Sequence, residues 1–468
     1  MGVVMSDVGA LRRIVKAYDV RGLVDEELTP AVARALGVAA AEELARPGDR
    51  LVVGHDMRPS SPVLVAAFTD GVLASGVDVI DIGLISTDGV TYASGLLDAP
   101  GAMFTASHNP AAYNGIKLCR ASAVPVAIDS GLARIRDRAI ALLDGTAAAV
   151  ETTAGAAVER GSRSELPLLT RFAEHVRSFL DGGVPLGGMR VVVDAGNGMG
   201  GLVWPAVTAG LDLETVPLYF ELDGTFPNHP ADPLDPANLR DLSARVVAEG
   251  AVLGLAFDGD ADRVFAVDAS GRPVDSSLLG ALVATRVLGR EPGGTVLYNL
   301  ICSRSVPEAI VAAGGVPVRT RVGHSFIKAE MARTGAVLGV EHSGHFYFRD
   351  NHRADSGTIA ALMLLEAVAA AGGSLADAVA PHDTRVRSGE RNLRVRDTAA
   401  ALDLVRDAYA AQAPDELDGL TVDLGAAWFN VRPSNTEPLL RLNVEADDAA
   451  TVEQVLTELV DLLATVVV

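Results

Sequence analysis

Residues 251–263 read Ala-Val-Leu-Gly-Leu-Ala-Phe-Asp-Gly-Asp-Ala-Asp-Arg, an apolar run that ends in three carboxylates at alternate positions. The apolar part, residues 251–257, predicts a buried strand. Asp258, Asp260 and Asp262 follow directly on its carboxyl end. In open α/β sheets, ligands bind beyond the carboxyl ends of the strands. The stretch therefore predicts an α/β sheet with a site loop at its edge.

The same order of apolar run, turn and helical pattern recurs along the chain. Strand-like runs are expected at residues 51–54, 78–82, 190–194, 295–300 and 336–340. Helices are expected at residues 62–75 and 357–371. Short apolar strands that alternate with helices indicate α/β units with largely parallel sheets.

The last part of the chain has a different pattern, which predicts a small α+β domain with an antiparallel sheet. Its expected strands are residues 391–395, 420–424, 427–431 and 439–444. Its expected helices are residues 398–412 and a final helix from Ala449. The length of 468 residues fits three or four domains at about 100–200 residues each.

Composition excludes several classes of protein. An apolar content of 49% and a charged content of 21% are those of a folded globular chain. The formal net charge of −21 argues against nucleic acid as a partner, and anionic small substrates would need a locally basic cleft. Two cysteines, Cys119 and Cys302, make neither a disulfide framework nor metal-ligand spacing. No signal peptide and no apolar stretch of about 18 residues is evident, so we expect a cytoplasmic protein without a membrane partner.

A serine stands beside an imidazole in the stretch Thr105-Ala-Ser-His-Asn-Pro110. The flanks differ from the Gly-x-Ser-x-Gly pattern of a hydrolase nucleophile elbow. A Ser107 hydroxyl needs activation to act as a nucleophile, whereas a phosphorylated serine needs charge neutralisation and in-line placement to donate. Beside the acidic stretch, Ser107 indicates phosphoryl transfer; by itself, the segment also fits an ordinary turn.

The acidic stretch favours a hard divalent cation, because carboxylate oxygens are the ligands that Mg²⁺ and Ca²⁺ prefer. An EF-hand is excluded, since its sixth and twelfth positions would be Arg263 and Ala269. Three carboxylates leave a coordination position for a phosphate oxygen. The alternative is an acidic turn in solvent.

Other polar segments are weaker candidates one by one. Glu341, His342, Ser343 and His345 fall within five residues and suit the vicinal hydroxyls of a sugar, although the two histidines also allow a zinc interpretation. A second group offers cations, hydroxyls and backbone donors for phosphate, and consists of Tyr18, Arg21, Lys117, His324, Lys328, Arg432, Ser434, Asn435 and Thr436. Each segment alone also fits a polar surface loop.

Taken in chain order, these motifs resemble those of the α-D-phosphohexomutase superfamily, in particular its bacterial phosphomannomutase/phosphoglucomutase subgroup. The resemblance covers essentially the whole chain. It implies three related α/β domains with mixed, mainly parallel sheets and a C-terminal α+β domain of the TATA-binding-protein-like type, around a central cleft. The domains expected to carry the phosphoserine, metal, sugar-recognition and phosphate-binding loops are 1–157, 158–271, 272–384 and 385–468, respectively.

The resemblance also implies roles for individual residues. Ser107 is expected as the phosphoserine, and a Ser107 phosphate oxygen joins Asp258, Asp260 and Asp262 as Mg²⁺ ligands. The expected catalytic residues are Ser107, His108, Lys117, Arg21 and Arg263. The expected substrate-binding residues are Tyr18, His324, Lys328, Glu341, Ser343, His345, Arg432, Ser434, Asn435 and Thr436. Two departures stand out: Val340 precedes Glu341 where the family commonly has Gly, and Ile301 stands where related mutases often have Lys, with Arg304 as a replacement.

The implied function is an isomerase that interconverts hexose 6-phosphate and hexose 1-phosphate, with mannose, glucose or both as the sugar. Phospho-Ser107 would form a bound hexose 1,6-bisphosphate, which turns and returns a phosphoryl group from its other end. Mg²⁺ is the expected cofactor, hexose 1,6-bisphosphate the activator and a sugar phosphate the partner of a monomer or weak dimer. Lys117, His108 or His345 would take the hydroxyl proton. The alternatives are a phosphoglucosamine mutase, a Mg-dependent sugar-phosphate phosphatase and a non-catalytic sugar-phosphate sensor.

Overall fold

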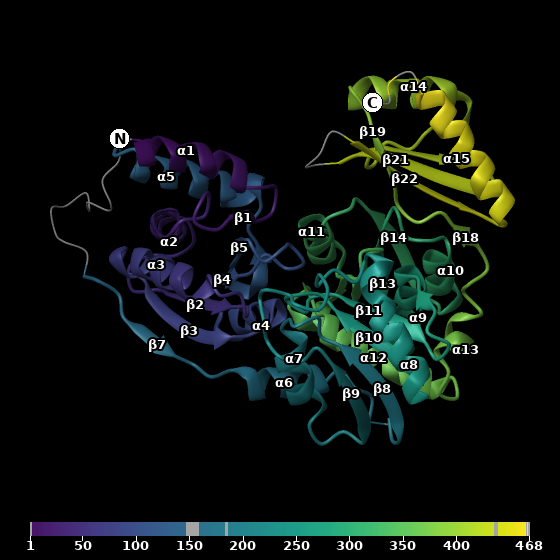
Figure 1. The fold of residues 1–468 in the computed structure, drawn as a ribbon, viewed down its shortest axis with the longest axis horizontal. Coiled ribbons are helices and arrows are strands. Elements are labelled where there is room, and N and C mark those ends of the chain that lie inside the picture. The colour runs from purple at the N-terminus through teal and green to yellow at the C-terminus, as the bar shows by residue number, and fades with distance from the viewer. Residues whose placement is uncertain (1, 147–158, 183–185, 435–438, 465, 467–468) are drawn as a thin grey trace. The chain divides into compact units, whose positions relative to one another are not determined.

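The computed structural model describes residues 2–146, 159–182, 186–434, 439–464 and 466. The chain forms two compact units, which we treat separately (Figure 1). The first unit comprises Met1–Val274 with Ser343–Ala376, and the second comprises Asp275–His342 with Asp377–Val468. Among the described residues, no helix is long and apolar enough to cross a membrane.

The first sheet of the first unit has the strand order β1-β5-β4-β2-β3-β7, and a short β6 pairs with β5. Strands β2, β3, β4 and β7 run parallel, whereas β5 pairs antiparallel with β1, β4 and β6. The bounds are β1 Val20–Leu23, β2 Arg50–His55, β3 Asp78–Leu84, β4 Gly101–Phe104, β5 Tyr113–Arg120, β6 Val124–Pro125 and β7 Arg163–Glu165. The sheet is therefore mixed.

Helices pack on this sheet around a buried apolar core. They are α1 Gly2–Ile14, α2 Pro30–Leu44, α3 Ser61–Ala74, α4 Thr87–Leu97 and α5 Ala133–Leu143, with short turns at η1 Ala121–Ala123 and η2 Ile128–Leu132. Thr29 caps α2 by accepting a hydrogen bond from the Val32 amide at 3.2 Å. Helices α2 and α3 lie in close contact because Gly37 has no Cβ, which would come within 2.1 Å of the Phe68 carbonyl oxygen.

A second sheet in the first unit has the order β12-β11-β10-β8-β9. Strands β8, β9 and β10 run parallel, β11 pairs antiparallel with β10, and β12 pairs antiparallel with β11. The bounds are β8 Met189–Asp194, β9 Leu213–Leu218, β10 Leu253–Phe257, β11 Val264–Asp268 and β12 Pro273–Val274. The helical segments are α6 Leu169–Arg177, α7 Gly200–Thr208, η3 Pro236–Leu239 and α8 Arg240–Glu249.

The segment Ser343–Ala376 belongs to the first unit although it lies late in the chain. It contains β16 Phe346–Phe348, η4 Arg349–Asn351, β17 Ala354–Asp355 and α12 Gly357–Ala370. Helix α12 is almost entirely buried and contacts α6, α7 and β11. Its apolar sequence is explained by this burial on all sides.

The second unit contains a parallel set of strands in the order β14-β13-β15. Their bounds are β13 Thr295–Asn299, β14 Val316–Thr320 and β15 Leu338–Val340. The helices are α9 Ser276–Arg290, α10 Ser305–Ala312 and α11 His324–Thr334; α13 Leu375–Val379 begins in the first unit and ends in the second.

The last part of the second unit is an antiparallel sheet in the order β18-β22-β21-β20, with β19 also paired to β22. The bounds are β18 Val386–Arg387, β19 Arg391–Arg394, β20 Leu420–Asp423, β21 Ala427–Pro433 and β22 Leu439–Ala446. Helices α14 Thr398–Ala408 and α15 Ala449–Leu463, with the turn η5 Ala410–Gln412, accompany the sheet, and its apolar residues form a separate core. The predicted α/β units with mixed sheets and the C-terminal α+β domain are confirmed, whereas the central cleft and the exact domain bounds stay predictions.

Candidate active site

Ser107 and the acidic stretch both lie directly beyond strand ends of the first unit, at β4 and β10 respectively. Ser107 is buried and has a left-handed backbone, with φ of 49°. Its amide donates a hydrogen bond to Thr105 Oγ1 at 2.8 Å, which stabilises the turn. The Ser107 hydroxyl donates to Asp258 Oδ2 at 2.7 Å, so two segments separated by 151 residues meet at this point.

The meeting of these segments depends on Gly259. A Cβ at this position would lie 2.4 Å from the Ser107 carbonyl oxygen and 3.1 Å from its carbonyl carbon. The Gly259 carbonyl also accepts a hydrogen bond from the Met199 amide at 2.9 Å. The glycine-rich segment 196–200, which follows β8, thus contacts the loop of the acidic stretch from another strand end.

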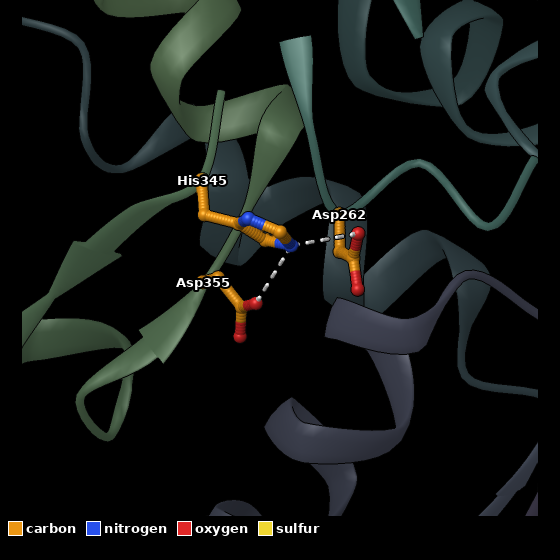
Figure 2. A group of neighbouring side chains, drawn as sticks. All are labelled: Asp262, His345 and Asp355. Carbon is orange, nitrogen blue, oxygen red and sulfur yellow. Dashed lines mark ion pairs between the residues drawn. The ribbon is translucent and has the colours of Figure 1, made fainter. Parts of the chain in front are cut away.

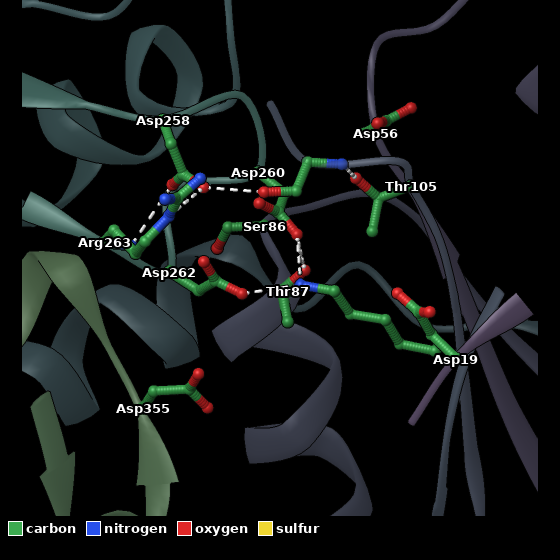
Figure 3. Close-up of polar contacts among 12 residues, drawn as sticks. Asp19, Asp56, Ser86, Thr87, Thr105, Asp258, Asp260, Asp262, Arg263 and Asp355 are labelled. Carbon is green, nitrogen blue, oxygen red and sulfur yellow. Dashed lines mark hydrogen bonds and ion pairs between the residues drawn. The ribbon is translucent and has the colours of Figure 1, made fainter. Parts of the chain in front are cut away.

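Asp258, Asp260 and Asp262 are buried, and each offers a carboxylate oxygen within 4.8 Å of the others (Figure 3). Among the described residues, Asp260 Oδ1 and Asp262 Oδ1 have no hydrogen-bond partner. Buried acceptors without partners are costly, and a cation would remove that cost. Hard oxygen donors in this number fit Mg²⁺, so the residues present fit the expected metal.

Lys117 on β5 supplies one positive charge to this cluster. Its Nζ lies 2.7 Å from Asp260 Oδ2 and 2.6 Å from Asp262 Oδ2. Burial acts to lower the pKa of Lys117, but the two carboxylates outweigh it and raise the pKa well above the ordinary value. Thr87 Oγ1 donates to Asp260 Oδ2 at 2.5 Å. Lys117 is therefore an ammonium when the site holds no cation.

Arg263 supplies a second positive charge and contacts His108. Its Nε donates to Asp258 Oδ2 at 2.8 Å, and its Nη2 donates to His108 Nδ1 at 2.6 Å. Because arginine can only donate, His108 Nδ1 must accept. Burial, with Arg263 next, lowers the pKa of His108 well below its ordinary value. The ring is therefore neutral and carries its proton on Nε2.

The carboxylates of the cluster differ in proton affinity. Burial raises the pKa of Asp258 well above its ordinary value, and Asp262 and Asp260 add to this effect against Arg263. Burial acts in the same direction on Asp260, but Lys117 lowers the pKa of that carboxyl below its ordinary value. The three clustered carboxylates can carry more negative charge than the positive charge of Lys117 and Arg263 offsets. This excess favours a bound divalent cation.

The side chain of Arg21, on β1, contacts the loop that carries Ser107, residues 105–113, which we call the serine loop. Its Nη1 donates to Asn109 Oδ1 at 2.6 Å, and its Nη2 pairs with Asp19 Oδ2 at 2.6 Å. Tyr18 lies two residues before β1. The structure thus brings Arg21, Ser107, His108, Lys117, Arg263 and the three aspartates together in the first unit.

Arg58 is a functional residue that the sequence interpretation missed. Its fully buried guanidinium donates to four backbone carbonyls of the serine loop, those of Ser107, Asn109, Pro110 and Tyr113, at 2.7–3.0 Å. Its Nε lies 3.2 Å from Asp56 Oδ2. A signal was present, because Asp56 and Arg58 follow strand β2 as the acidic stretch follows β10.

Ser343 and His345 also lie in the first unit, next to the metal loop. The Val264 amide donates to the Gly344 carbonyl at 3.2 Å. The Ser343 hydroxyl lies 3.0 Å from His345 Nδ1, and His345 Nε2 faces Asp262 Oδ1 at 3.7 Å and Asp355 Oδ2 at 3.9 Å (Figure 2). The sequence contains no distinctive signal for Asp355, which lies in the two-residue strand β17.

Glu341 belongs to the second unit and is buried. Its Oε1 accepts hydrogen bonds from Asn299 Nδ2 and the Gly323 amide, both at 3.1 Å. His324 and Lys328 stand one turn apart at the start of α11, directly after Gly323. These residues therefore gather at the carboxyl ends of β13, β14 and β15, as the parallel set predicts.

Ile301, which stands where related mutases often have a lysine, is buried. The suggested replacement, Arg304, has its guanidinium bonded elsewhere in the second unit. It donates to the Gly425 carbonyl at 2.8 Å and pairs with Asp423 Oδ1 at 2.8 Å. The structure therefore gives no support to Arg304 as a substitute sugar contact.

Arg432 and Ser434 lie at the end of β21 in the second unit. Arg432 is buried, and its Nη2 donates to Glu390 Oε2 at 3.0 Å. The Ser434 amide donates to the Leu439 carbonyl at 2.9 Å, directly after the last residue of β21. Asn435 and Thr436 lie outside the described residues.

Family models for all four phosphoglucomutase/phosphomannomutase domains match this chain in order. Alpha/beta/alpha domains I, II and III match residues 12–141, 171–271 and 275–384, and the C-terminal domain matches residues 390–462. The chain belongs to the phosphoglucomutase/phosphomannomutase family. Membership makes it an enzyme of the isomerase class.

Known proteins are similar over nearly the whole length. A chain named "Phosphohexose mutases" from Xanthomonas campestris is 44% identical over 96% of this chain and 98% of its own. A phosphomannomutase/phosphoglucomutase from Pseudomonas aeruginosa is 36% identical over 95% and 94%, respectively. A solved structure of a phosphoglucomutase/phosphomannomutase family protein from Burkholderia thailandensis aligns with a TM-score of 0.86 at 31% identity, covering 97% of both chains.

Proposed function

We propose that the chain interconverts hexose 6-phosphate and hexose 1-phosphate, with mannose, glucose or both as the sugar. Phospho-Ser107 donates the phosphoryl group, and a bound hexose 1,6-bisphosphate is the intermediate. The observation that carries the proposal is the contact between Ser107 Oγ and Asp258 Oδ2 at 2.7 Å, which joins the serine to the acidic cluster. Family membership supports the same reaction.

In this proposal Asp258, Asp260 and Asp262 hold Mg²⁺, together with an oxygen of the Ser107 phosphate. The ion would supply charge neutralisation for the phosphoryl group during transfer. The acceptors on Asp260 and Asp262 that lack hydrogen-bond partners support this assignment. Arg263 holds Asp258 in place through its Nε and directs a second nitrogen to His108.

The proposed transfer forms one P–O bond as another breaks. A sugar hydroxyl oxygen attacks the phosphorus of phospho-Ser107 as its proton passes to a base. The bond to Ser107 Oγ breaks, the electron pair stays on Oγ, and Oγ takes up a proton to become the serine hydroxyl. The bisphosphate then turns, and Ser107 Oγ takes a phosphoryl group from the opposite end. Positioning and electrostatics supply most of the rate in such a transfer.

His345 is the proton acceptor that we propose among the three candidates. Lys117 has a raised pKa and is already protonated, and His108 uses Nδ1 to accept from Arg263. His345 Nε2 lies 3.7 Å from Asp262 Oδ1 and 3.9 Å from Asp355 Oδ2, and these carboxylates can orient the ring.

The remaining predicted residues are proposed to bind the substrate. Glu341, Ser343 and His345 suit sugar hydroxyls because they combine acceptors and donors. Arg432, Ser434, Asn435 and Thr436 suit the phosphate that does not react, and the other predicted substrate contacts are Tyr18, His324 and Lys328. Arg21 stays a proposed catalytic residue. The bisphosphate activator follows from the need to phosphorylate Ser107 before turnover.

A turnover assay tests the function. It uses mannose 1-phosphate, glucose 1-phosphate and glucosamine 1-phosphate, with Mg²⁺ and a catalytic trace of glucose 1,6-bisphosphate. We expect 6-phosphate products from mannose 1-phosphate, glucose 1-phosphate or both. Release of inorganic phosphate as the main product would indicate a phosphatase, preference for glucosamine 1-phosphate a phosphoglucosamine mutase, and binding without turnover a sensor.

Ser107→Ala is the matching variant, and it should lose at least about 10³-fold in kcat because no residue remains to carry the phosphoryl group. Ser164→Ala, at an exposed serine on β7, is the control and should keep the wild-type rate. A Ser107→Ala enzyme that turns over at a near-normal rate would remove the phosphoserine from the proposal.

A further inference from the structure

Two arginines stand directly opposite each other in the C-terminal sheet. Arg432 on β21 pairs in register with Arg441 on β22. The Arg432 side chain is 7% exposed and the Arg441 side chain 32% exposed. Like charges at directly opposite positions of paired strands destabilise a sheet, and burial of a guanidinium adds a desolvation cost. This part of the sheet therefore needs a negative charge.

Glu390 supplies that charge from the residue directly before β19. Its Oε2 accepts from Arg432 Nη2 at 3.0 Å, and its Oε1 lies 3.2 Å from Arg441 Nη1. Burial, the largest influence, lowers the pKa of Arg432, and Glu390 acts against this effect. Glu390 is thus the carboxylate bonded to both cations, and Asp418 also acts to raise the pKa of Arg432. The Glu390 side chain is 23% exposed, within reach of solvent and solutes.

The two arginines keep donors that Glu390 does not use. The Nε atoms of Arg432 and Arg441 are buried and have no hydrogen-bond partner among the described residues. A guanidinium has five donor hydrogens in a fork that matches a phosphate. A phosphate carries more negative charge than a carboxylate and has more acceptor oxygens, so it can compete with Glu390 for these donors.

We propose that Glu390 is an exchangeable counter-ion of the phosphate-binding arginine: it neutralises Arg432 in the substrate-free enzyme and is replaced there by the substrate's non-reacting phosphate. The inference rests on the proposed function, which assigns that phosphate to Arg432. The consequence is weaker binding of the substrate's phosphate to Arg432, because the arriving phosphate must displace an anion that is already bonded.

Weaker binding of phosphate to Arg432 favours one step of the proposed reaction, the release of the intermediate. The bisphosphate intermediate must leave the phosphate-binding residues, turn and bind again through its other phosphate. A buried Arg432 without any anion would raise the free energy of the moment at which neither phosphate is bound. Glu390 returns to Arg432 at that moment and so favours release of the intermediate.

Glu390→Gln tests the proposal because it keeps the shape of the side chain and removes its charge. We expect the inhibition constant of inorganic phosphate and the KM for glucose 1-phosphate both to fall about fivefold, a modest change on the scale of one lost charge–charge contact. Dissociation of glucose 1,6-bisphosphate should slow. Glu416→Gln is the matched control, since Glu416 pairs with Arg406 at the exposed surface of the same unit, and it should change none of these values.

The opposite sign would overturn the proposal. If Glu390 only orients Arg432, Glu390→Gln raises the inhibition constant of phosphate; if Glu390 only supports the sheet, the variant lowers Tm and leaves that constant unchanged. Glu390→Asp, which keeps the charge and withdraws it by one methylene, should give a smaller fall, and it serves if the glutamine variant does not fold. Arg432→Gln separates the two proposals: a raised KM keeps the proposed function whatever Glu390→Gln shows, whereas an unchanged KM overturns the assignment of Arg432 and this inference with it.

Discussion

At the scale of single residues, Arg58 explains how the serine loop is held. Its guanidinium donates to four carbonyl oxygens of the loop, while Asp258 accepts from the Ser107 hydroxyl. Carbonyl oxygens would repel a phosphoryl group, so their orientation matters to the proposed chemistry. Asp56 offsets the buried charge of Arg58.

Arg58→Lys should therefore damage both stability and rate. Lysine has three donors on a single nitrogen and cannot reach all four carbonyls, and each buried acceptor left unpaired costs about 1–3 kcal/mol. We expect at least about 1–3 kcal/mol less stability against denaturant and about a hundredfold lower kcat. Arg138→Lys, at the exposed pair with Glu42, is the control, and equal effects of the two substitutions would contradict this role of Arg58.

Sequence reasoning found individual site residues where chemistry follows a strand end. Ser107 and the three aspartates were predictable because each follows an apolar run. The ion pairs of Lys117 with Asp260 and Asp262 were not predictable. The two aspartates lie 143 and 145 residues away, and no local pattern encodes such contacts. Glu390 was also missed, since its role depends on the register of β21 and β22.

At the scale of elements, a buried carboxylate joins the amino ends of two helices in the first unit. Asp88, in the first turn of α4, accepts hydrogen bonds from the hydroxyls of Ser86, Ser356 and Thr358, the last two at 2.6 and 3.1 Å. Ser356 also caps α12 through the Ile359 amide. Thr87, the residue directly before Asp88, donates a hydrogen bond to Asp260. The junction therefore supports the loop that carries the three clustered aspartates.

Asp88 should make stability depend on pH. Burial raises the pKa of Asp88 to about 7, although the hydroxyl of Ser356, with those of Ser86 and Thr358, opposes it. A carboxyl whose pKa is raised on folding binds more protons in the folded state, so its stabilisation is full below pH of about 4 and is lost as the pH rises through about 7. Asp88→Asn cannot titrate, and Tm measured at pH 5 and pH 8 should fall less for this variant than for the wild type. An equal fall in both proteins would contradict the prediction.

Gly259 sets the distance between the serine loop and the metal loop. Gly259→Ala would place a Cβ 2.4 Å from the Ser107 carbonyl oxygen, which forces the loops apart. A displacement of about 1 Å can lower a rate about a hundredfold, so we expect that loss in kcat together with a higher Mg²⁺ requirement. Gly289→Ala, in α9, meets no atom within 4 Å and should leave both unchanged. Normal activity of Gly259→Ala would show that the loops tolerate separation.

Elements were predictable where their pattern is local. Strands β2, β3, β8, β13 and the helix α12 lie within a few residues of their expected bounds. Strand β11, which returns antiparallel beside β10, was missed because no glycine-rich turn separates it from the acidic stretch. Helix α1 was missed because residues 1–13 were interpreted only as lacking the pattern of a signal peptide, without a secondary-structure prediction.

At the scale of the whole molecule, the chain carries a net charge of −21, with 60 acidic residues against 39 lysines and arginines, and several of these cations are proposed to meet an anionic substrate. Lys117, Arg263, Arg21 and Arg432 are all paired with carboxylates or amides in the substrate-free chain. The family and its fold class followed from motif order. The assignment of Ser343–Ala376 to the first unit did not, since it depends on packing between segments distant in sequence.

The central claim is that Ser107 carries the phosphoryl group. Its most direct test is to incubate the enzyme with Mg²⁺ and glucose 1,6-bisphosphate, map the phosphorylated residue by tandem mass spectrometry, and then add glucose 6-phosphate. We predict one phosphate on Ser107 that the sugar phosphate removes within a single turnover. A turnover-competent enzyme whose Ser107 never carries phosphate, or whose phosphate stays in place when the sugar is added, would contradict the claim.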